Sequence, residues 1–155
     1  MLPLEDALAQ MLNQLPFPTK TETLALTEAA DRVCAEDVIS PINVPSFDNS
    51  AMDGYAVRLA DLQQSMTLSV AGKSFAGNPF QGEWGAQSAV RIMTGAMIPE
   101  GADAVVMQED VTVNEDGTVT FSALPKANQN IRRIGEDVKK GLYADGQSKH
   151  VDANS

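Results

Sequence analysis

The stretch from Pro45 to Val57, PSFDNSAMDGYAV, is the most informative part of this 155-residue sequence. Its opening proline favours an extended or turning backbone over a helix. Asp, Asn, Ser and Gly crowd its middle, and they form turns because their side chains bond nearby backbone or because glycine tolerates a positive φ angle. We therefore predict a braced polar loop that presents the carboxylates of Asp48 and Asp53. The apolar residues that would anchor this loop are Phe47, Met52 and Tyr55.

Short runs of strand-forming residues follow the loop, separated by turn-forming residues. Residues 66–70 alternate apolar and polar side chains, which is typical of a half-buried strand. The run 104–107 is apolar, and the run 89–93 is apolar apart from Arg91. Residues 111–113 and 119–121 flank an Asn-Glu-Asp-Gly turn, which indicates a hairpin. This pattern predicts a compact, mainly β domain of short, bent strands.

The N-terminal residues predict helices. Apolar residues recur at helical spacing from Leu4 to Leu15, after a proline and with two acidic residues in the first turn. A short helix over Thr27–Val33, capped by Thr27, is also expected. We therefore classify the fold as α+β, mainly β, with short helices before the β domain.

Four segments are expected along the chain. Residues 1–44 would form a helical and linker segment, and residues 45–124 the compact β domain. Residues 125–140 would return as a strand to the linker segment. Residues 141–155 are polar and without periodicity, so they are expected to be disordered.

Composition narrows the class of protein. The net charge of −10 argues against nucleic-acid and anionic-membrane binding, since both need clustered Lys and Arg. Cys34 is the only cysteine and lies among apolar residues, so it is expected to be buried. His150 is the only histidine and lies in the polar tail, which disfavours mechanisms that need a catalytic histidine. The sequence shows no secretory leader and no apolar run near the ~20 residues of a membrane span, so we expect a cytoplasmic protein.

Further motifs follow in order: GKSFAG at 72–77, RIMTGA at 91–96, PEGADAVVMQE at 99–109 and NIRRIGED at 130–137. Together with the 45–57 segment, they resemble the molybdopterin molybdenumtransferase family, which comprises the bacterial MoeA proteins and the E domain of gephyrin. The resemblance runs from about Leu4 to about Lys140. Such proteins continue into a pterin-binding domain, which nothing in this chain resembles. A truncation, an interrupted reading frame and an excised portion all remain open.

The resemblance implies a role in molybdenum cofactor biosynthesis, in which molybdate is inserted into adenylylated molybdopterin with Mg²⁺ and release of AMP. It matches Asp53 and Thr94 to catalytic residues, with Asp53 also the Mg²⁺ ligand. Asp48, Asn49 and Ser50 share the loop and are candidate cofactor-binding residues. Because Asp53 and Thr94 each occupy a turn that presents polar groups, we expect them to share one face of the β domain. The implied partners are a second copy of the chain and, upstream, molybdopterin adenylyltransferase.

Each candidate residue also has a structural interpretation. Asp53 could bond its own turn, Thr94 could end a strand, and residues 48–50 could simply fix the loop. The turn at Lys73-Ser74 lacks the spacing of a phosphate loop.

Two clusters of charged residues also allow a structural or a functional interpretation. Arg132 and Arg133 lie near two carboxylates, as an ion-pair network or as an anion-binding edge. At most one arginine would serve a given site, because adjacent residues of a strand point to opposite faces. Glu109 and Asp110 are adjacent and are expected to form a solvated strand end.

Three interpretations of function follow. The chain is part of a molybdenumtransferase, or a non-catalytic half-site or assembly module that is inactive without the pterin-binding domain, or the product of a truncated pseudogene.

Overall fold

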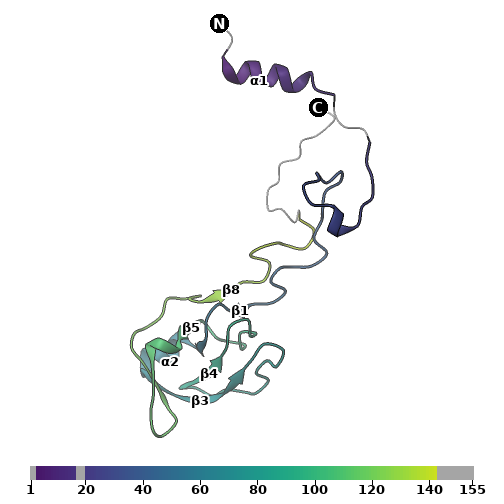
Figure 1. Cartoon of the computed structure of the whole chain (residues 1–155). Coiled ribbons are helices and arrows are strands. Elements are labelled where there is room, and N and C mark those ends of the chain that lie inside the picture. Colours follow the sequence, from purple (N-terminus) through teal and green to yellow (C-terminus); the bar gives the residue numbers. More distant parts are fainter. Residues whose placement is uncertain (1–2, 17–19, 143–155) are drawn as a thin grey trace. The chain divides into compact units, whose positions relative to one another are not determined.

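The computed structural model describes residues 3–16 and 20–142, and Figure 1 shows their course. The chain divides into two units, the first with the described residues up to Val38 and the second with those from Ile39 onward. The first unit contains helix α1 (Leu4–Asn13) and a single 3₁₀ turn, η1 (Leu26–Glu28). None of the described residues in this unit is buried, so they form no core of their own.

Helix α1 confirms the helix predicted near the N-terminus. Pro3 occupies its N-cap position, and Glu5 and Asp6 lie in its first turn, where carboxylates interact favourably with the helix dipole. Its apolar side chains, such as Leu4 and Met11, are exposed. No described residue therefore covers the apolar face of this helix.

Two expectations for the first unit are wrong. The helix over Thr27–Val33 is replaced by the 3₁₀ turn, and Thr27 lies inside that turn instead of capping a helix. Asp31 adopts a φ of 61°, a left-handed conformation that interrupts a right-handed helix. Cys34 is exposed, because no core forms around it.

The second unit is the β domain, and it confirms the mainly β, α+β fold class. Its main sheet has six strands in the order β5-β2-β4-β3-β7-β6, antiparallel except for the parallel pair β3 and β4. The strands are β2 (Gly54–Val57), β3 (Thr67–Ser74), β4 (Ser88–Ile92), β5 (Ala104–Met107), β6 (Val111–Val113) and β7 (Val119–Phe121). Helix α2 (Leu59–Gln64) joins β2 to β3, and the 3₁₀ turn η2 (Gln108–Asp110) joins β5 to β6.

Both faces of the sheet are packed. Tyr55 and Val57 belong to one buried cluster, with Leu68 and Phe121. Ala56, between them in sequence, belongs to a second cluster, because side chains alternate between the faces of a strand. The other members of the second cluster are Val90, Ile92, Ala96 and Val105.

The prediction of a single loop over 45–57 is wrong at its C-terminal end. Residues 54–57 form β2, an inner strand that pairs with both β4 and β5. Gly54 makes this pairing possible, since a Cβ atom there would lie 1.9 Å from the carbonyl oxygen of Val106. Tyr55 is 7% exposed and does anchor the segment, whereas Phe47 is 38% exposed and contributes little.

A two-stranded stem carries the chain into and out of the β domain. Strand β1 (Asn49–Ser50) pairs with β8 (Ile131–Arg132), and an isolated bridge joins Val44 to Val138. Ser40 N donates to the carbonyl of Leu142 at 3.0 Å. The return of residues 125–140 therefore runs antiparallel beside the segment that precedes the domain (Figure 1).

The expected disordered tail lies, from residue 143 onward, outside the described residues. Across the described residues, none of the helices has the length and apolar character needed to cross a membrane.

Candidate functional site

The candidate site lies at one edge of the main sheet, where three chain segments meet. Strand β2 runs antiparallel to β4 and β5, so its beginning lies beside their ends. Asp53 precedes β2, Thr94 follows β4, and Gln108 follows β5. The topology thus gathers residues that are up to 55 positions apart in sequence (108 − 53).

Asp53 and Thr94 are in direct contact. Asp53 Oδ1 accepts a hydrogen bond from the Thr94 backbone N–H at 2.7 Å and another from Thr94 Oγ1 at 2.6 Å. The other carboxylate oxygen, Oδ2, accepts no hydrogen bond from the described part of the chain. The expectation that these two residues share a location is confirmed, while their catalytic roles remain predictions.

These contacts favour the ionised form of Asp53. The Thr94 hydroxyl and then the Thr94 N–H lower the pKa of the Asp53 carboxyl below its ordinary value, and the nearby Arg91 charge adds to this. Hydrogen bonds donated to a carboxylate favour its charged form. Asp53 therefore presents a negatively charged oxygen at the edge of the sheet.

Arg91 braces this arrangement, and sequence analysis did not single it out. Its Nη1 donates to the carbonyl of Gly54 at 2.7 Å, and its Nη2 donates to Gln108 Oε1 at 2.5 Å. The Gln108 N–H donates in turn to the carbonyl of Asp53 at 3.0 Å. The signal in the sequence was a charged residue between the apolar residues Val90 and Ile92.

The candidate cofactor-binding residues 48–50 are engaged with the protein itself. Asp48 Oδ1 accepts the Ile134 N–H at 2.7 Å, Oδ2 contacts Arg133, and these two contacts hold the pKa of Asp48 below its ordinary value. Asn49 Nδ2 donates to the Phe47 carbonyl at 3.2 Å, and Asn49 is buried.

Ser50 is buried as well and lies closer to the candidate site. Its Oγ donates to the Met52 carbonyl at 2.6 Å. Its backbone carbonyl accepts from the N–H of Gly95, the residue after Thr94, at 2.8 Å. The described contacts of residues 48–50 thus brace the segment that leads to Asp53.

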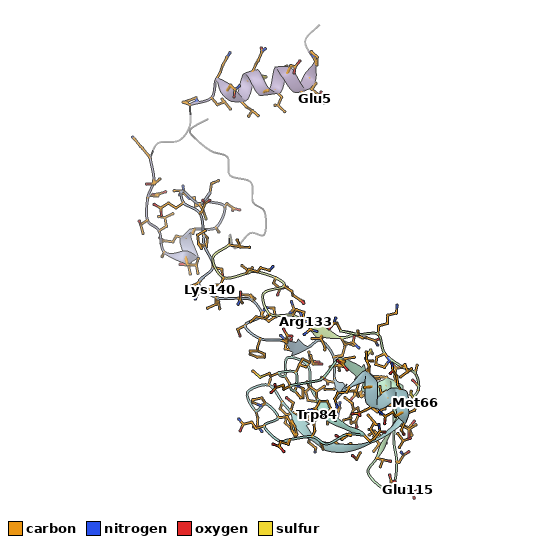
Figure 2. The ribbon with its side chains drawn as sticks, turned by 180° about the vertical axis from the view of Figure 1, so that it is seen from behind. Glu5, Met66, Trp84, Glu115, Arg133 and Lys140 are labelled. Carbon is orange, nitrogen blue, oxygen red and sulfur yellow. The ribbon has the colours of Figure 1, made fainter. Side chains whose placement is uncertain are left out.

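The other charged candidates form internal contacts. Arg132 pairs with Glu136 at 2.7 Å and with Asp137 at 2.6 Å, and Arg133 contacts Asp48 and Asn128. Figure 2 shows Arg133 at the stem side of the β domain, at the opposite end from Glu115 in the hairpin.

The remaining polar candidates also have structural settings. Ser74 is fully buried and its Oγ donates to the Met97 carbonyl at 2.9 Å, whereas Lys73 is exposed. Glu109 and Asp110 lie in η2, and both are exposed.

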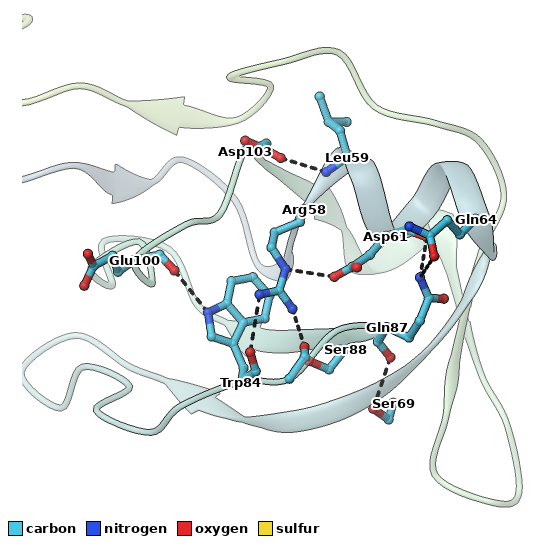
Figure 3. A network of polar contacts seen from close by, with 11 residues as sticks. Arg58, Leu59, Asp61, Gln64, Ser69, Trp84, Gln87, Ser88, Glu100 and Asp103 are labelled. Carbon is cyan, nitrogen blue, oxygen red and sulfur yellow. Dashed lines mark hydrogen bonds and ion pairs between the residues drawn. The ribbon is translucent and has the colours of Figure 1, made fainter.

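A second polar network surrounds Arg58 and is separate from the candidate site (Figure 3). Arg58 pairs with Asp61 at 2.8 Å, donates to the carbonyls of Trp84 and Gly85, and lies 4.1 Å from the centroid of the Trp84 ring. A shallow depression of about 510 Å³ adjoins it and contains none of the predicted site residues. Its lining is Phe80, Gln81, Gly82, Glu83, Trp84 and Glu100.

The donor set at Asp53 fits only part of a magnesium site. Within residues 3–16 and 20–142, no group of three or more His, Cys, Asp and Glu side chains could hold a metal ion. Mg²⁺ is commonly held by one or two carboxylates, with waters and substrate phosphates as its other ligands. Asp53 Oδ2 could supply one such ligand.

The model of the MoeA N-terminal region (domain I and II) matches residues 2–153 of this sequence. The chain belongs to this family. It is 81% identical over 141 residues to the molybdopterin molybdenumtransferase of Haemophilus influenzae, and 42% identical over 130 residues to that of Bacillus subtilis. These matches cover 91% and 79% of this chain but only 35% and 30% of the relatives. The chain therefore spans about a third of the length of these relatives.

A solved structure of the same family gives the same picture. The crystal structure of the molybdopterin biosynthesis MoeA protein of Pyrococcus horikoshii is similar, with a TM-score of 0.71 and 37% sequence identity. The match covers 92% of this chain and 38% of that one. The family resemblance stated from the motifs is confirmed.

Proposed function

We propose that this chain is the N-terminal part of a molybdopterin molybdenumtransferase and contributes Asp53 and Thr94 to its active site. The reaction would insert molybdate into adenylylated molybdopterin and release AMP. The single observation that supports this most is the Asp53 carboxylate, whose Oδ1 is held by two Thr94 bonds while Oδ2 accepts no hydrogen bond from residues 3–16 and 20–142. Membership of the MoeA N-terminal region family supports the choice of reaction.

In this proposal Asp53 is a ligand of Mg²⁺, and Thr94 orients the carboxylate. The bound ion would neutralise charge on phosphate oxygens of the nucleotide. Thr94 lowers the pKa of Asp53 and fixes one of its oxygens, so that the other is available without rearrangement. Asp48, Asn49 and Ser50 would act on the cofactor through the shape of the loop that they brace.

We also propose that this site is half of a complete one. Asp53 supplies a single carboxylate, and the remaining contacts to the pterin and nucleotide would come from the pterin-binding domain of a second subunit in a homodimer. The chain alone is then a half-site or assembly module. Its substrate would be supplied by molybdopterin adenylyltransferase, and the expected location is the cytoplasm.

The test uses the reaction itself, in a chain that carries the complete family sequence. Asp53→Asn should reduce molybdenum insertion by about 100-fold or more, because an amide is a poor Mg²⁺ ligand, and even partners one step removed from a metal contribute about 10–100-fold. Asp116→Asn is the control and should leave the rate unchanged. A fully active Asp53→Asn enzyme would remove Asp53 from the mechanism, and synthesis by the isolated chain would overturn the half-site.

A further inference from the structure

The charged side chain of Arg91 is unusual for its position. It is half-buried in β4 between the buried residues Val90 and Ile92, and its Cζ lies 5.1 Å from the centroid of the Tyr55 ring. Among the described residues, no carboxylate oxygen lies within the 4.0 Å of a salt bridge to Arg91. Its guanidinium instead donates to neutral acceptors, so ion pairing does not explain its place.

The hydrogen bonds of Arg91 close a circuit around the Asp53 turn. Nη1 donates to the carbonyl of Gly54, and Nη2 to Gln108 Oε1, at 2.7 and 2.5 Å. The Gln108 N–H donates to the Asp53 carbonyl at 3.0 Å. One planar guanidinium thus ties the start of β2 to the end of β5, and its rigid fork of donors fixes the two acceptors more firmly than one rotatable ammonium would.

We propose that Arg91 is a positioning residue, which holds the Asp53-Gly54 backbone so that Oδ1 accepts both Thr94 bonds and Oδ2 is left without a hydrogen bond from the described residues. The inference deepens the proposed function and rests on it for the purpose of that oxygen. Without Arg91, the backbone pairing between β2 and β5 would remain. The Gly54 carbonyl and the Gln108 side chain would lose the guanidinium that joins them, so the Asp53-Gly54 backbone would be held less firmly. The Asp53 carboxylate would then sample orientations that leave Thr94.

The test compares Arg91→Met with Arg58→Met in the whole chain. Arg58 is a matched control, because both arginines contact an aromatic ring and donate to two backbone carbonyls, those of Trp84 and Gly85 for Arg58 and those of Gly54 and Ile92 for Arg91. Amide exchange by NMR should speed up at Thr94 and Gln108 by about fivefold to tenfold in Arg91→Met, the effect of losing one net hydrogen bond, and should stay unchanged in Arg58→Met. The amides of Val90 and Val105 report whether the sheet is intact.

Mn²⁺ provides a second readout of the same turn. Its paramagnetic broadening of the Thr94 amide should need about fivefold to tenfold more Mn²⁺ in Arg91→Met than in the unmodified chain. If the unmodified chain shows no broadening at all, the metal role of Asp53 fails, and the exchange experiment alone decides the role of Arg91.

Arg91→Lys keeps the proposal testable if Arg91→Met does not fold. Lysine keeps the charge and the aliphatic stem but replaces the rigid fork with one rotatable ammonium, which holds Gly54 and Gln108 less firmly, so exchange at Thr94 or Gln108 should still accelerate. Folded Arg91→Met or Arg91→Lys chains with exchange and broadening equal to those of Arg58→Met would overturn the proposal.

Discussion

The β domain contains one polar contact twice, in two very different settings. Asp53 Oδ1 accepts from the N–H and Oγ1 of Thr94, and Asp116 Oδ1 accepts from the N–H and Oγ1 of Thr118. In both, the threonine lowers the pKa of the aspartate. Each aspartate is also followed by a glycine.

The difference between the two pairs is the path of the chain. Asp116 and Thr118 are two positions apart and close the turn of a hairpin, which any short Asp-x-Thr sequence can do. Asp53 and Thr94 are 41 positions apart and meet only because β2, β4 and β5 are aligned. The same hydrogen bonds therefore stabilise a turn in one place and assemble a site in the other.

The two glycines should separate the pairs most strongly. Gly54→Ala places a Cβ 1.9 Å from the Val106 carbonyl oxygen, so it should lower the free energy of unfolding by about 3 kcal/mol or more. Gly117 has a φ of +82° with open space around it, so Gly117→Ala should cost only about 1 kcal/mol. Urea unfolding measures both, and equal losses would contradict the claim that the first pair depends on strand packing.

Removing the threonine hydroxyls should separate function from stability. Thr94→Val keeps the shape and the backbone bond but removes one bond to Asp53, so activity of the complete enzyme should fall about fivefold to tenfold. Because Thr94 is exposed, the free energy of unfolding of the Thr94→Val variant should barely change.

Thr118→Val is the counterpart in the hairpin. Besides the bond to Asp116, this substitution removes Thr118 Oγ1 as an acceptor for Asn114 Nδ2, which lies 2.8 Å from it. The free energy of unfolding should therefore fall by about 1 kcal/mol, while activity should stay intact. Parallel activity and urea measurements check both variants. A loss of activity in Thr118→Val with the fold preserved would undo the distinction.

Acid should affect the two pairs alike, and this is the smallest expected effect. Each aspartate has a lower pKa folded than unfolded, so its contribution to stability is present above the ordinary Asp pKa of about 3.9 and is lost as the pH falls through the folded pKa. The unmodified chain should be more stable than Asp53→Asn and Asp116→Asn, and this difference in the free energy of unfolding should shrink below about pH 4. Thermal unfolding at pH 3 and pH 6 tests the sign, and an advantage that grows in acid would refute it.

Local sequence patterns correctly predicted the hairpin, one strand and the N-terminal helix. The Asn114–Gly117 turn, the alternation before Val70 and the helical spacing after Pro3 all depend on neighbours in sequence, and the structure contains the corresponding hairpin, strand β3 and helix α1. The same reasoning failed at Gly54–Val57, where turn-forming residues run directly into an inner strand. Cys34 was also misjudged, since burial depends on a core that its described unit lacks.

The candidate site was partly predictable for a similar reason. Asp53 and Thr94 stand out because each lies in a polar turn, and the family resemblance matched both. Arg91 and Gln108 lie in the quoted motifs but were not named as site candidates, because their importance comes from bonds across strands that no local pattern encodes. Residues 48–50 share the loop with Asp53, yet their side-chain contacts are made with the loop backbone and the return segment.

The stem described above also sets the mechanical behaviour of the β domain. The Ser40–Leu142 and Val44–Val138 contacts lie one behind the other along two antiparallel segments, with β1 and β8 beyond them. A force that draws residues 39 and 142 apart would load these contacts one at a time, so they would break one after another. The Arg133–Asp48 contact and then the β1–β8 pairing would open next, and both must break before tension reaches the sheet edge that carries Asp53 and Thr94.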